Sequence, residues 1–293
     1  MLTLVSTPLG NLNDITLRGL ETIFRAQVIL CEDTRVAKKL YFLLIDKELF
    51  NSLSSCYFTK DEHIQRFKQK SFLAFHSHNQ EKFLRDIRKD FFTQDVIYIS
   101  DAGMPCISDP GAILVSYCIR HGIEYDVLPG ISALNVCFAA SGIESSRFFF
   151  GGFLPHKQTD RKQTLSFYTK LGFPCIWYES PHRLLQTLKD MESTLPDAYI
   201  CACKEISKIH QKRYFGSATE IIVQLQGDRI CGEWVLCVEN RQGAQEFQNG
   251  CNSIGVEDII ALPLAPKLKA KLLAKITQKP IKQCYEELLF HTV

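Results

Sequence analysis

Short apolar runs that alternate with amphipathic stretches constrain the fold of this chain more than any other feature. Apolar runs of strand length occur at residues 2–6, 28–32, 72–76, 95–100 and 124–128. Between them, residues 14–25 and 79–92 carry apolar side chains at helical spacing. This alternation is typical of a mostly parallel sheet that helices cover on both faces. We therefore predict an α/β domain over residues 1–115.

A second series of such elements follows. Apolar runs recur at residues 147–154, 174–179, 198–205 and 233–239. A helix is predicted over residues 181–191, with Ser180 as its N-cap. These elements predict a second α/β domain over residues 116–240, and 293 residues are enough for two domains of about 100–200 residues each. Residues 241–254 are rich in Gly, Gln and Asn and predict a linker, and residues 255–293 predict a basic helical segment.

The composition excludes several classes of protein. Hydrophobic residues make up 46% of the chain and charged residues 23%, a balance that argues against intrinsic disorder. The chain has no run of about 18 apolar residues, so no membrane span is predicted. The first residues do not resemble a signal peptide. Twelve cysteines without an export signal indicate reduced thiols, so we expect a cytoplasmic protein with no membrane partner.

The net charge of +2 is unevenly distributed along the chain. Six lysines and no acidic residue fall between Ile259 and Tyr285, which gives this segment a charge of +6 and the remainder −4. Lysines bind the phosphates of nucleic acids, so the segment predicts contact with a polyanion. A solvated helix face and a surface for a partner protein are the alternatives. The six are Lys267, Lys269, Lys271, Lys275, Lys279 and Lys282.

Polar, turn-forming clusters follow four successive strands of the first domain. They comprise residues 7–11, 32–35, 76–79 and 101–105. Ligands of open α/β sheets bind beyond the carboxyl ends of the strands, so the clusters predict a ligand site. Asp101 follows a buried run directly, and Gly103 and Pro105 shape a turn whose backbone N–H groups suit a polar ligand. Asp33 and Asp109 have an alternative role as helix caps.

The second domain carries further clusters of this kind. They comprise residues 129–133, 151–155, 178–183 and 204–208. His182 and Arg183 lie in the first turn of the predicted helix, where they are available to an anion. The alternative for Arg183 is a solvated surface charge.

No metal site is predicted. His76 and His78 form an H-x-H pattern without an evident third ligand. Cys201 and Cys203 lie on one face of a predicted strand, and we interpret them as small buried hydrophobes, with zinc binding or redox chemistry as the alternative. The chain has neither a P-loop nor a G-x-G-x-x-G motif, so triphosphate and Rossmann-type dinucleotide binding lose their usual support. It also lacks the G-x-S-x-G motif of hydrolases.

Eight motifs occur in a characteristic order over about residues 2–240. They are TPLGNLNDITLRGLETI, CEDTR, HSHN, SDAGMPCISDPG, LPGISAL, GGFLP, YESPHRLLQTL and KEISKIH. In this order the chain resembles the small-subunit ribosomal RNA methyltransferase I family of the tetrapyrrole methylase superfamily. The resemblance implies two α/β domains of the tetrapyrrole methylase type with the cofactor cleft between them.

The same resemblance implies a reaction and its participants. S-adenosyl-L-methionine is the expected cofactor. The expected reaction is 2′-O-ribose methylation of a cytidine in the decoding region of 16S ribosomal RNA, within the small ribosomal subunit. A homodimer is the expected assembly.

The resemblance and the charge pattern together imply three sets of site residues. Cofactor contact is expected at Pro8, Leu9, Gly10, Asp101, Gly103, Met104, Ser132, Ala133 and Tyr178. Lys204 and Glu205 are the candidates for catalysis, with an exposed ion pair at a strand end as the alternative. Substrate contact is expected at His78, Asn79, His182, Arg183, Lys267, Lys269, Lys271 and Lys275.

Some positions depart from the residues usual in the family. They are Met104 in place of Thr, Cys106 in place of Gly, Gln80 in place of an acid and Ile131 in place of Pro. Met104 and Ile131 belong to the expected cofactor pocket, so these changes bear on its affinity.

Two other functions are alternatives. A precorrin-type tetrapyrrole C-methyltransferase has the same fold, but such enzymes usually show Gly-x-Gly-Pro-Gly-Asp where this chain has TPLGN at residues 7–11. A non-catalytic protein that binds RNA or the ribosome would be expected to lack the cofactor loops, which are all present.

Overall fold

The computed structural model describes residues 1–53, 58–240, 255–277 and 279–290. The chain divides into two compact units, Met1–Val136 with Ile206–Ile209, and Cys137–Glu205 with His210–Val293. The linker predicted at residues 241–254 lies outside the described residues.

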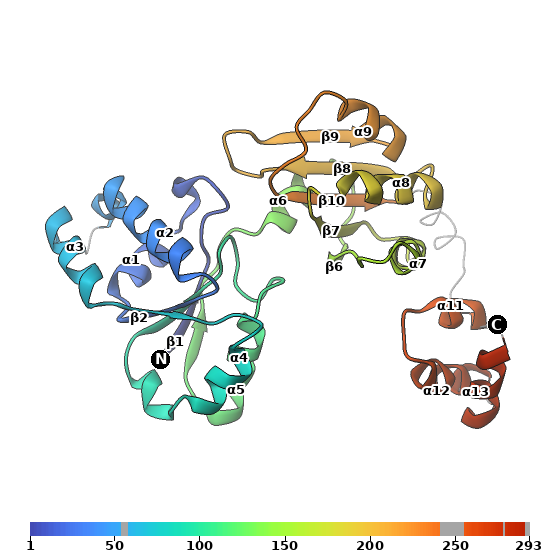
Figure 1. The fold of residues 1–293 in the computed structure, drawn as a ribbon, viewed down its shortest axis with the longest axis horizontal. Coiled ribbons are helices and arrows are strands. Elements are labelled where there is room, and N and C mark those ends of the chain that lie inside the picture. Colours follow the sequence, from blue (N-terminus) through green and yellow to red (C-terminus); the bar gives the residue numbers. More distant parts are fainter. Residues whose placement is uncertain (54–57, 241–254, 278, 291–293) are drawn as a thin grey trace. The chain divides into compact units, whose positions relative to one another are not determined.

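The first unit, which is coloured blue to green in Figure 1, is built on a parallel five-stranded sheet in the order β3-β2-β4-β1-β5. Its strands coincide with the five predicted apolar runs, which confirms the α/β class of this part of the chain. In chain order the elements are β1 (Leu2–Val5), α1 (Leu17–Arg25), β2 (Val28–Cys31), α2 (Thr34–Asp46), α3 (Lys60–Gln69), β3 (Ser71–Ala74), α4 (Gln80–Asp86), β4 (Val96–Ile99), α5 (Gly111–His121) and β5 (Tyr125–Val127).

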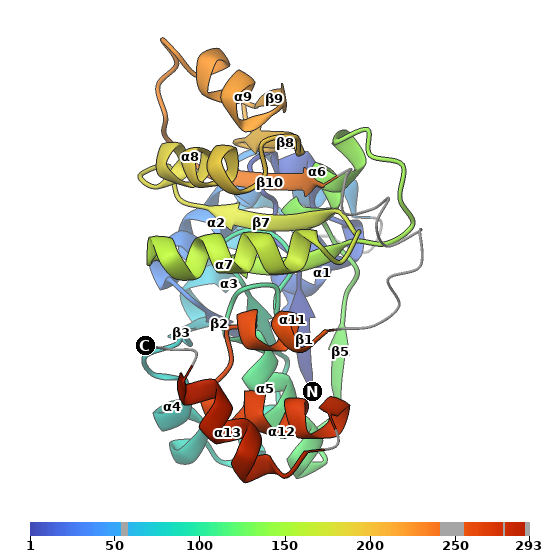
Figure 2. The ribbon, with the colours of Figure 1, turned by 90° about the vertical axis from the view of Figure 1, so that its right-hand side faces the viewer.

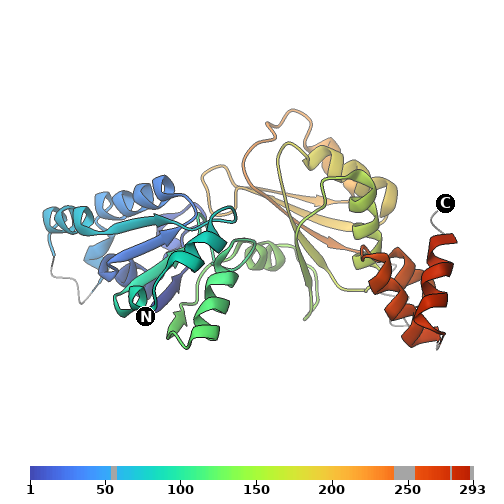
Figure 3. The same ribbon diagram turned by 60° about the horizontal axis from the view of Figure 1, so that its bottom comes forward.

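Helices cover both faces of this sheet (Figure 3). Successive strand residues point to opposite faces. Val5 of β1 therefore joins the cluster under α1 and α2, while Leu4 joins the cluster under α4 and α5. In the first cluster the rings of Phe24 and Tyr41 meet edge to face with centroids 5.3 Å apart. Strands β1, β2 and β4 are buried along their whole length, as strands of a doubly covered sheet are expected to be.

Two helices of the first unit differ from the predicted ranges. Helix α1 begins at Leu17 because the Thr16 hydroxyl accepts the Gly19 backbone N–H at 3.0 Å and caps the helix, while Asp14 belongs to a preceding 3-10 turn. The helix predicted over residues 79–92 is divided. Helix α4 ends at Asp86, and a 3-10 turn follows at Lys89–Thr93.

The first unit also extends beyond residue 115. Strand β5 pairs in parallel with β1, with Leu2 opposite Tyr125 and Leu4 opposite Val127, so it completes the first sheet. The two units separate after Val136, within α6 (Ala133–Ala140). The boundary at residue 115 was predicted too early in the chain because an apolar run does not reveal which sheet its strand will join.

The second unit contains a mixed five-stranded sheet in the order β6-β7-β10-β8-β9. Strands β6 and β7 are parallel, and the other neighbouring pairs are antiparallel. Helix α8 begins three residues after its predicted start, with Arg183 as N-cap in place of Ser180. Strand β9 was not predicted, since its sequence KRYFG carries two cations. The elements are β6 (Phe149–Phe153), α7 (Gln158–Thr169), β7 (Cys175–Glu179), α8 (Leu184–Thr194), β8 (Tyr199–Lys204), β9 (Lys212–Gly216), α9 (Ala218–Gln224) and β10 (Trp234–Glu239).

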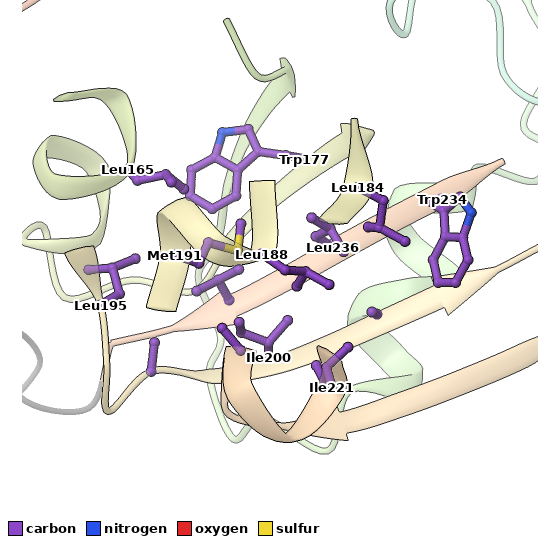
Figure 4. Packing of buried hydrophobic residues seen from close by; sticks show 14 of the residues in the cluster. Leu165, Trp177, Leu184, Leu188, Met191, Leu195, Ile200, Ile221, Trp234 and Leu236 are labelled. Atoms are coloured by element: carbon purple, nitrogen blue, oxygen red, sulfur yellow. The ribbon is translucent and has the colours of Figure 1, made fainter. Parts of the chain in front are cut away.

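Helices α7, α8 and α9 bury one face of the second sheet. Leu188 and Met191 of α8 lie in one cluster with Trp177 of β7 and Leu236 of β10 (Figure 4). Helices α7 and α8 run side by side over this face (Figure 2). The second α/β domain is thus confirmed, although its sheet is largely antiparallel.

A buried ion pair ties α7 to α8. Arg161 is 3% exposed and donates its Nε to Oδ2 of Asp190, which is 1% exposed, at 2.8 Å. The Nη1 of Arg161 also donates to the carbonyls of Pro155 and His156 at 3.1 and 3.0 Å. The pair therefore fixes the loop between β6 and α7 as well as the two helices.

The C-terminal segment is helical, as predicted, with α11 (Val256–Ala261), α12 (Pro266–Thr277) and α13 (Ile281–Phe290) (Figure 1). A small apolar core holds the three helices together, formed by Ile259, Ala270, Leu273, Cys284 and Leu288. Among the helices of the described residues, none has the length and apolar character that crossing a bilayer requires.

The buried ion pair predicts a stability difference between two neighbouring cations. Arg161→Met leaves Asp190 charged and buried, so we expect a loss of about 3–5 kcal/mol in the free energy of unfolding. The control Lys162→Met removes a cation that lies 3.9 Å from the same carboxylate but is 39% exposed, so its loss should stay below about 1 kcal/mol. Urea denaturation of both variants measures the difference, and equal losses would contradict this role of Arg161.

Candidate functional site

The loops that follow β1, β4 and β5 meet at the carboxyl edge of the first sheet, because β1 pairs with both other strands. Thr7 and Gly103 join the first two loops through two backbone hydrogen bonds of 3.0 Å. The Ser6 hydroxyl donates to the Ile131 carbonyl at 3.1 Å and joins the third loop. Helices α1 and α5, which follow β1 and β4, cover opposite faces of the sheet. This edge is therefore the point at which open α/β sheets bind ligands.

The three loops approach so closely that two positions require glycine. A Cβ atom on Gly130 would lie 2.1 Å from the Cβ of Ser6. Gly103 has a φ of +84°, in the left-handed region, and a Cβ there would lie 3.0 Å from Leu9 Cδ2. The loops thus form one packed cluster, which we call the β1/β4/β5 loop cluster: residues 6–11, 101–104 and 129–133.

Most residues with a predicted cofactor contact lie in this cluster. Those in the first unit are Pro8, Leu9, Gly10, Asp101, Gly103, Met104, Ser132 and Ala133. Tyr178 lies in the second unit at the end of β7, where its ring packs edge to face on Phe150 and Phe153 with centroids 5.0 and 5.6 Å apart. Contact of these residues with a cofactor stays a prediction.

Three carboxylates lie together at this edge: Asp101 within the loop cluster, and Glu32 and Asp33 beside it. The Asp33 backbone N–H donates to Asp101 Oδ1, and the Asp101 backbone N–H donates to Glu32 Oε1, each at 3.2 Å. Burial raises the pKa of Asp101, and the charge of Asp33 adds to the rise. Burial also raises the pKa of Glu32, with added contributions from the charges of Asp109 and Asp101. A positively charged ligand would relieve this repulsion.

Asp33 has the capping role that was the alternative for it, whereas Asp109 has a structural role one residue before Pro110, the N-cap of α5. Asp33 is the N-cap of α2, and its Oδ1 accepts the Arg35 backbone N–H at 2.8 Å. Oδ1 of Asp109 accepts the backbone N–H groups of Cys106 and Gly111 at 2.9 and 2.7 Å, at the start of α5. Cys106 has a φ of +71°, in the left-handed region that glycine adopts without strain.

Lys208 also belongs to this region, although the sequence indicated it only as a member of the polar cluster at residues 204–208. Residues Ile206–Ile209 belong to the first unit, although they follow β8 of the second. The side chain of Lys208 passes so close to Gly10 that a Cβ atom there would lie 2.1 Å from Lys208 Cγ. The Ser207 hydroxyl donates to the Asp14 carboxylate. Lys208 lies in the motif KEISKIH, but a motif so far from Gly10 in the sequence does not indicate that the two residues are in contact.

The predicted catalytic residues Lys204 and Glu205 are engaged in hydrogen bonds within the second unit. Lys204 is 7% exposed, and its Nζ donates to the Arg229 carbonyl at 2.6 Å. Oε1 of Glu205 accepts the Glu233 backbone N–H at 2.9 Å, and Glu205 has a φ of +52°. The buried lysine does not fit the alternative of an exposed ion pair.

Of the two residues predicted to bind an anion at α8, one is already paired. Arg183 donates to Oε1 of the buried Glu179 through Nε at 2.9 Å and to the Leu154 carbonyl through Nη2 at 2.7 Å. The Thr187 hydroxyl donates to the second oxygen of Glu179 at 2.6 Å. The alternative of a solvated charge is therefore wrong, and the anion contact of Arg183 competes with a structural pair. His182 is exposed.

His78 and Asn79 lie in the turn after β3. Asn79 Oδ1 accepts the His76 backbone N–H, and its Nδ2 donates to the Ala74 carbonyl, each at 2.8 Å, so this side chain shapes the turn. His78 is exposed, with its ring centroid 5.9 Å from that of His76. Substrate contact by either residue stays a prediction.

The lysines of α12 divide by helix face. Lys267, Lys271 and Lys275 are exposed and follow one another at intervals of four residues, so they share one face, which we call the lysine stripe. Lys269 instead donates its Nζ to the Ile260 carbonyl at 2.6 Å. In α13, Glu287 accepts from Lys279 at 2.8 Å. The exposed lysines of α12 therefore all belong to the stripe.

Comparison with known proteins gives consistent similarities. Residues 1–222 match the family described as Tetrapyrrole (Corrin/Porphyrin) Methylases. The chain is 43% identical over 97% of its length to a Helicobacter pylori protein named Ribosomal RNA small subunit methyltransferase I, of which it covers 96%.

Solved structures share the fold. The crystal structure of diphthine synthase is 15% identical with a TM-score of 0.55, over 84% of this chain and 95% of that one. Uroporphyrin-III C-methyl transferase from Thermus thermophilus, complexed with S-adenyl homocysteine, is 16% identical with a TM-score of 0.50, over 80% and 96% of the two chains. At these identities the likeness concerns the fold alone.

The close approach of Gly130 to Ser6 can be tested with a pair of substitutions. Gly130→Ala forces a Cβ into the Ser6 side chain, so we expect a loss of about 1–3 kcal/mol in the free energy of unfolding. Ser6→Gly removes the atoms in the way and should restore most of this loss in the double variant. Denaturant titration of the single and double variants measures the coupling, and strictly additive losses would show that the two backbones are not in contact.

Proposed function

Because the chain belongs to the tetrapyrrole methylase family, and within it to the ribosomal RNA small subunit methyltransferases I, we propose that it transfers a methyl group from S-adenosyl-L-methionine to small-subunit ribosomal RNA. The finer proposal is 2′-O-methylation of a cytidine ribose in the decoding region, on the small subunit, by a cytoplasmic homodimer. One observation carries the proposal: the 43% identity to a protein of that name extends over nearly the whole length of both chains.

The β1/β4/β5 loop cluster supports the choice of cofactor. S-adenosyl-L-methionine combines a carboxylate, an ammonium group, a sulfonium cation and an adenine. Backbone N–H groups of glycine-containing loops suit the carboxylate, and Leu9 and Met104 offer apolar surface to the adenine. The carboxylates of Asp101 and Glu32, whose pKa values are raised, suit a cation.

The transfer itself requires the ribose oxygen to be aligned with the methyl group. Methyl transfer is an in-line displacement, in which the C–S bond breaks as the C–O bond forms, so positioning supplies much of the rate. The 2′-hydroxyl must also lose its proton, and Lys204 and Glu205 stay our candidates to assist this loss. Their present hydrogen bonds give both residues a structural role as well.

The direct test uses methyl-labelled S-adenosylmethionine and small subunits from a strain that lacks the enzyme. We expect label in the ribosomal RNA, in a nucleotide that resists alkaline cleavage, because that cleavage needs a free 2′-hydroxyl. Label that does not block cleavage would overturn the 2′-O position while supporting RNA methylation. Label in a corrinoid substrate instead would support the tetrapyrrole alternative, and no transfer to either would support a non-catalytic role.

The substitution Asp101→Asn should weaken cofactor binding without lowering the stability of the fold. The raised pKa of Asp101 means that its ionised form disfavours the folded state, so the variant should be at least as stable at pH 7. It should bind S-adenosylmethionine about tenfold more weakly, or about 1.4 kcal/mol. Affinity of the unchanged protein should fall as the pH falls through this raised pKa, and the variant should lose that dependence.

Calorimetric titration measures these effects with two ligands, S-adenosylmethionine and S-adenosylhomocysteine. The sulfur of the second ligand carries no charge. A loss confined to the first ligand would place the carboxylate at the sulfonium, and an equal loss would place it at the shared ammonium group. An unchanged affinity for both would remove Asp101 from the cofactor site.

The lysine stripe predicts a salt-dependent contribution to RNA binding. Replacing Lys267, Lys271 and Lys275 with Gln should reduce the slope of log K against log salt by about 2–3, since each phosphate contact contributes about 0.7–0.9. Cofactor affinity should not change. The matched control removes three exposed lysines of the first unit, Lys39, Lys47 and Lys68. If the control lowers the slope as much, net charge and not the stripe is responsible.

A further inference from the structure

Three buried cysteines meet in the second unit. Cys201 and Cys203 of β8 alternate with Ile200 and Ala202, which join the core under α8, so the two cysteines point to the other face of the sheet. Cys137 of α6 lies against that face. The Sγ atoms of Cys201 and Cys203 are 3.7 Å apart, and the three Sγ atoms all lie within 4.8 Å of one another.

No other such group of metal-ligating side chains occurs in the part of the chain that the structure describes. Each of the three cysteines is at most 1% exposed. In the present arrangement the Cys137 thiol donates to the carbonyls of Val235 and Cys201 at 3.7 and 3.9 Å. The interpretation of Cys201 and Cys203 as small hydrophobes accounts for their burial, but not for a third sulfur that reaches them from a separate helix.

A cation is available to balance negative charge on the cluster. Arg213 of β9 lies directly opposite Cys203 in the antiparallel register. Residues directly opposite each other in a sheet have their side chains on the same face, so the Arg213 side chain lies on the same face of the sheet as Cys203. A thiolate at Cys203 thus has a counter-charge on the neighbouring strand.

We propose that Cys137, Cys201 and Cys203 form a site for one soft metal ion, Cu(I), held by three thiolate sulfurs. Thiolates select soft ions such as Cu(I). With metal–sulfur distances of about 2.3 Å, a trigonal site places its sulfurs about 4.0 Å apart, so the observed spacing needs to change little. Zinc prefers four ligands, and the fourth position of a three-cysteine zinc site is usually a water molecule, which this buried cluster disfavours.

Binding is an exchange of protons for the metal and involves no change of oxidation state. Three S–H bonds break, three protons leave to solvent, and three Cu–S bonds form. The resulting centre carries a charge of −2, which Arg213 partly offsets. Because the ligands come from α6 and β8, the bound ion would stabilise the folded state.

The full-length protein tests the proposal by competition with the chelator bathocuproine disulfonate under nitrogen, with ascorbate as reductant. We expect one Cu(I) per chain to be retained, with a raised midpoint of thermal unfolding. X-ray absorption of the copper-loaded protein should show three sulfur neighbours, a readout that needs no variant. Failure to retain Cu(I), or a first shell of nitrogen and oxygen, would overturn the proposal.

Variants assign the ligands. Cys203→Ala and Cys137→Ala should each weaken Cu(I) binding by at least about 100-fold, since changes outside the ligand shell alone cost about 10–100-fold. The matched control is Cys175→Ala, which removes an equally buried thiol from the opposite face of the same sheet. A control that loses as much affinity would overturn the assignment, as would tighter retention of Zn²⁺ than of Cu(I) in parallel competition.

Discussion

The candidate site depends above all on the pairing of β1 with β4 on one side and β5 on the other. The register places Val5 opposite Ile99 and Leu4 opposite Val127, so the three strands end at the same level. Their loops are then close enough to share hydrogen bonds, and the space between them admits no side chain at Gly130. A slip of one residue would turn buried residues to the wrong face and separate the loops.

Much of the fold was accessible from the sequence because strands covered on both sides must be apolar throughout. The five strands of the first sheet are found where the apolar runs indicated. Strand β9 was not predicted because an edge strand needs few buried residues, and its cations Lys212 and Arg213 interrupt the apolar pattern. The C-terminal limit of the first unit was not predicted because it depends on the pairing of β1 with β5. That pairing is a contact between distant segments, which local periodicity does not encode.

Local sequence patterns indicated the parts of the candidate site that lie at strand ends and helix caps. They did not indicate contacts between segments that are far apart in the chain. Strand ends indicated the loop cluster, and capping preferences indicated the role of Asp33 as the N-cap of α2. The contact of Lys208 with Gly10 was not predicted because it depends on tertiary structure. For Arg183 the alternative of a solvated charge was wrong, although its partner Glu179 lies only four residues earlier. Spacing alone does not show whether such an ion pair is buried and therefore structural. Cys137 likewise joins Cys201 and Cys203 only through the packing of α6.

Residues 206–209 belong to the first unit although they follow β8, so a part of that unit is synthesised late. Chains fold from the N-terminus as they emerge. The first sheet can therefore form once β5 has been made, but Gly10 and Asp14 gain Lys208 and Ser207 as neighbours only after β8 has been translated. The loop cluster of the nascent first unit is thus completed by a later part of the chain, and a fragment that ends at Val136 would carry the whole sheet but an unfinished site.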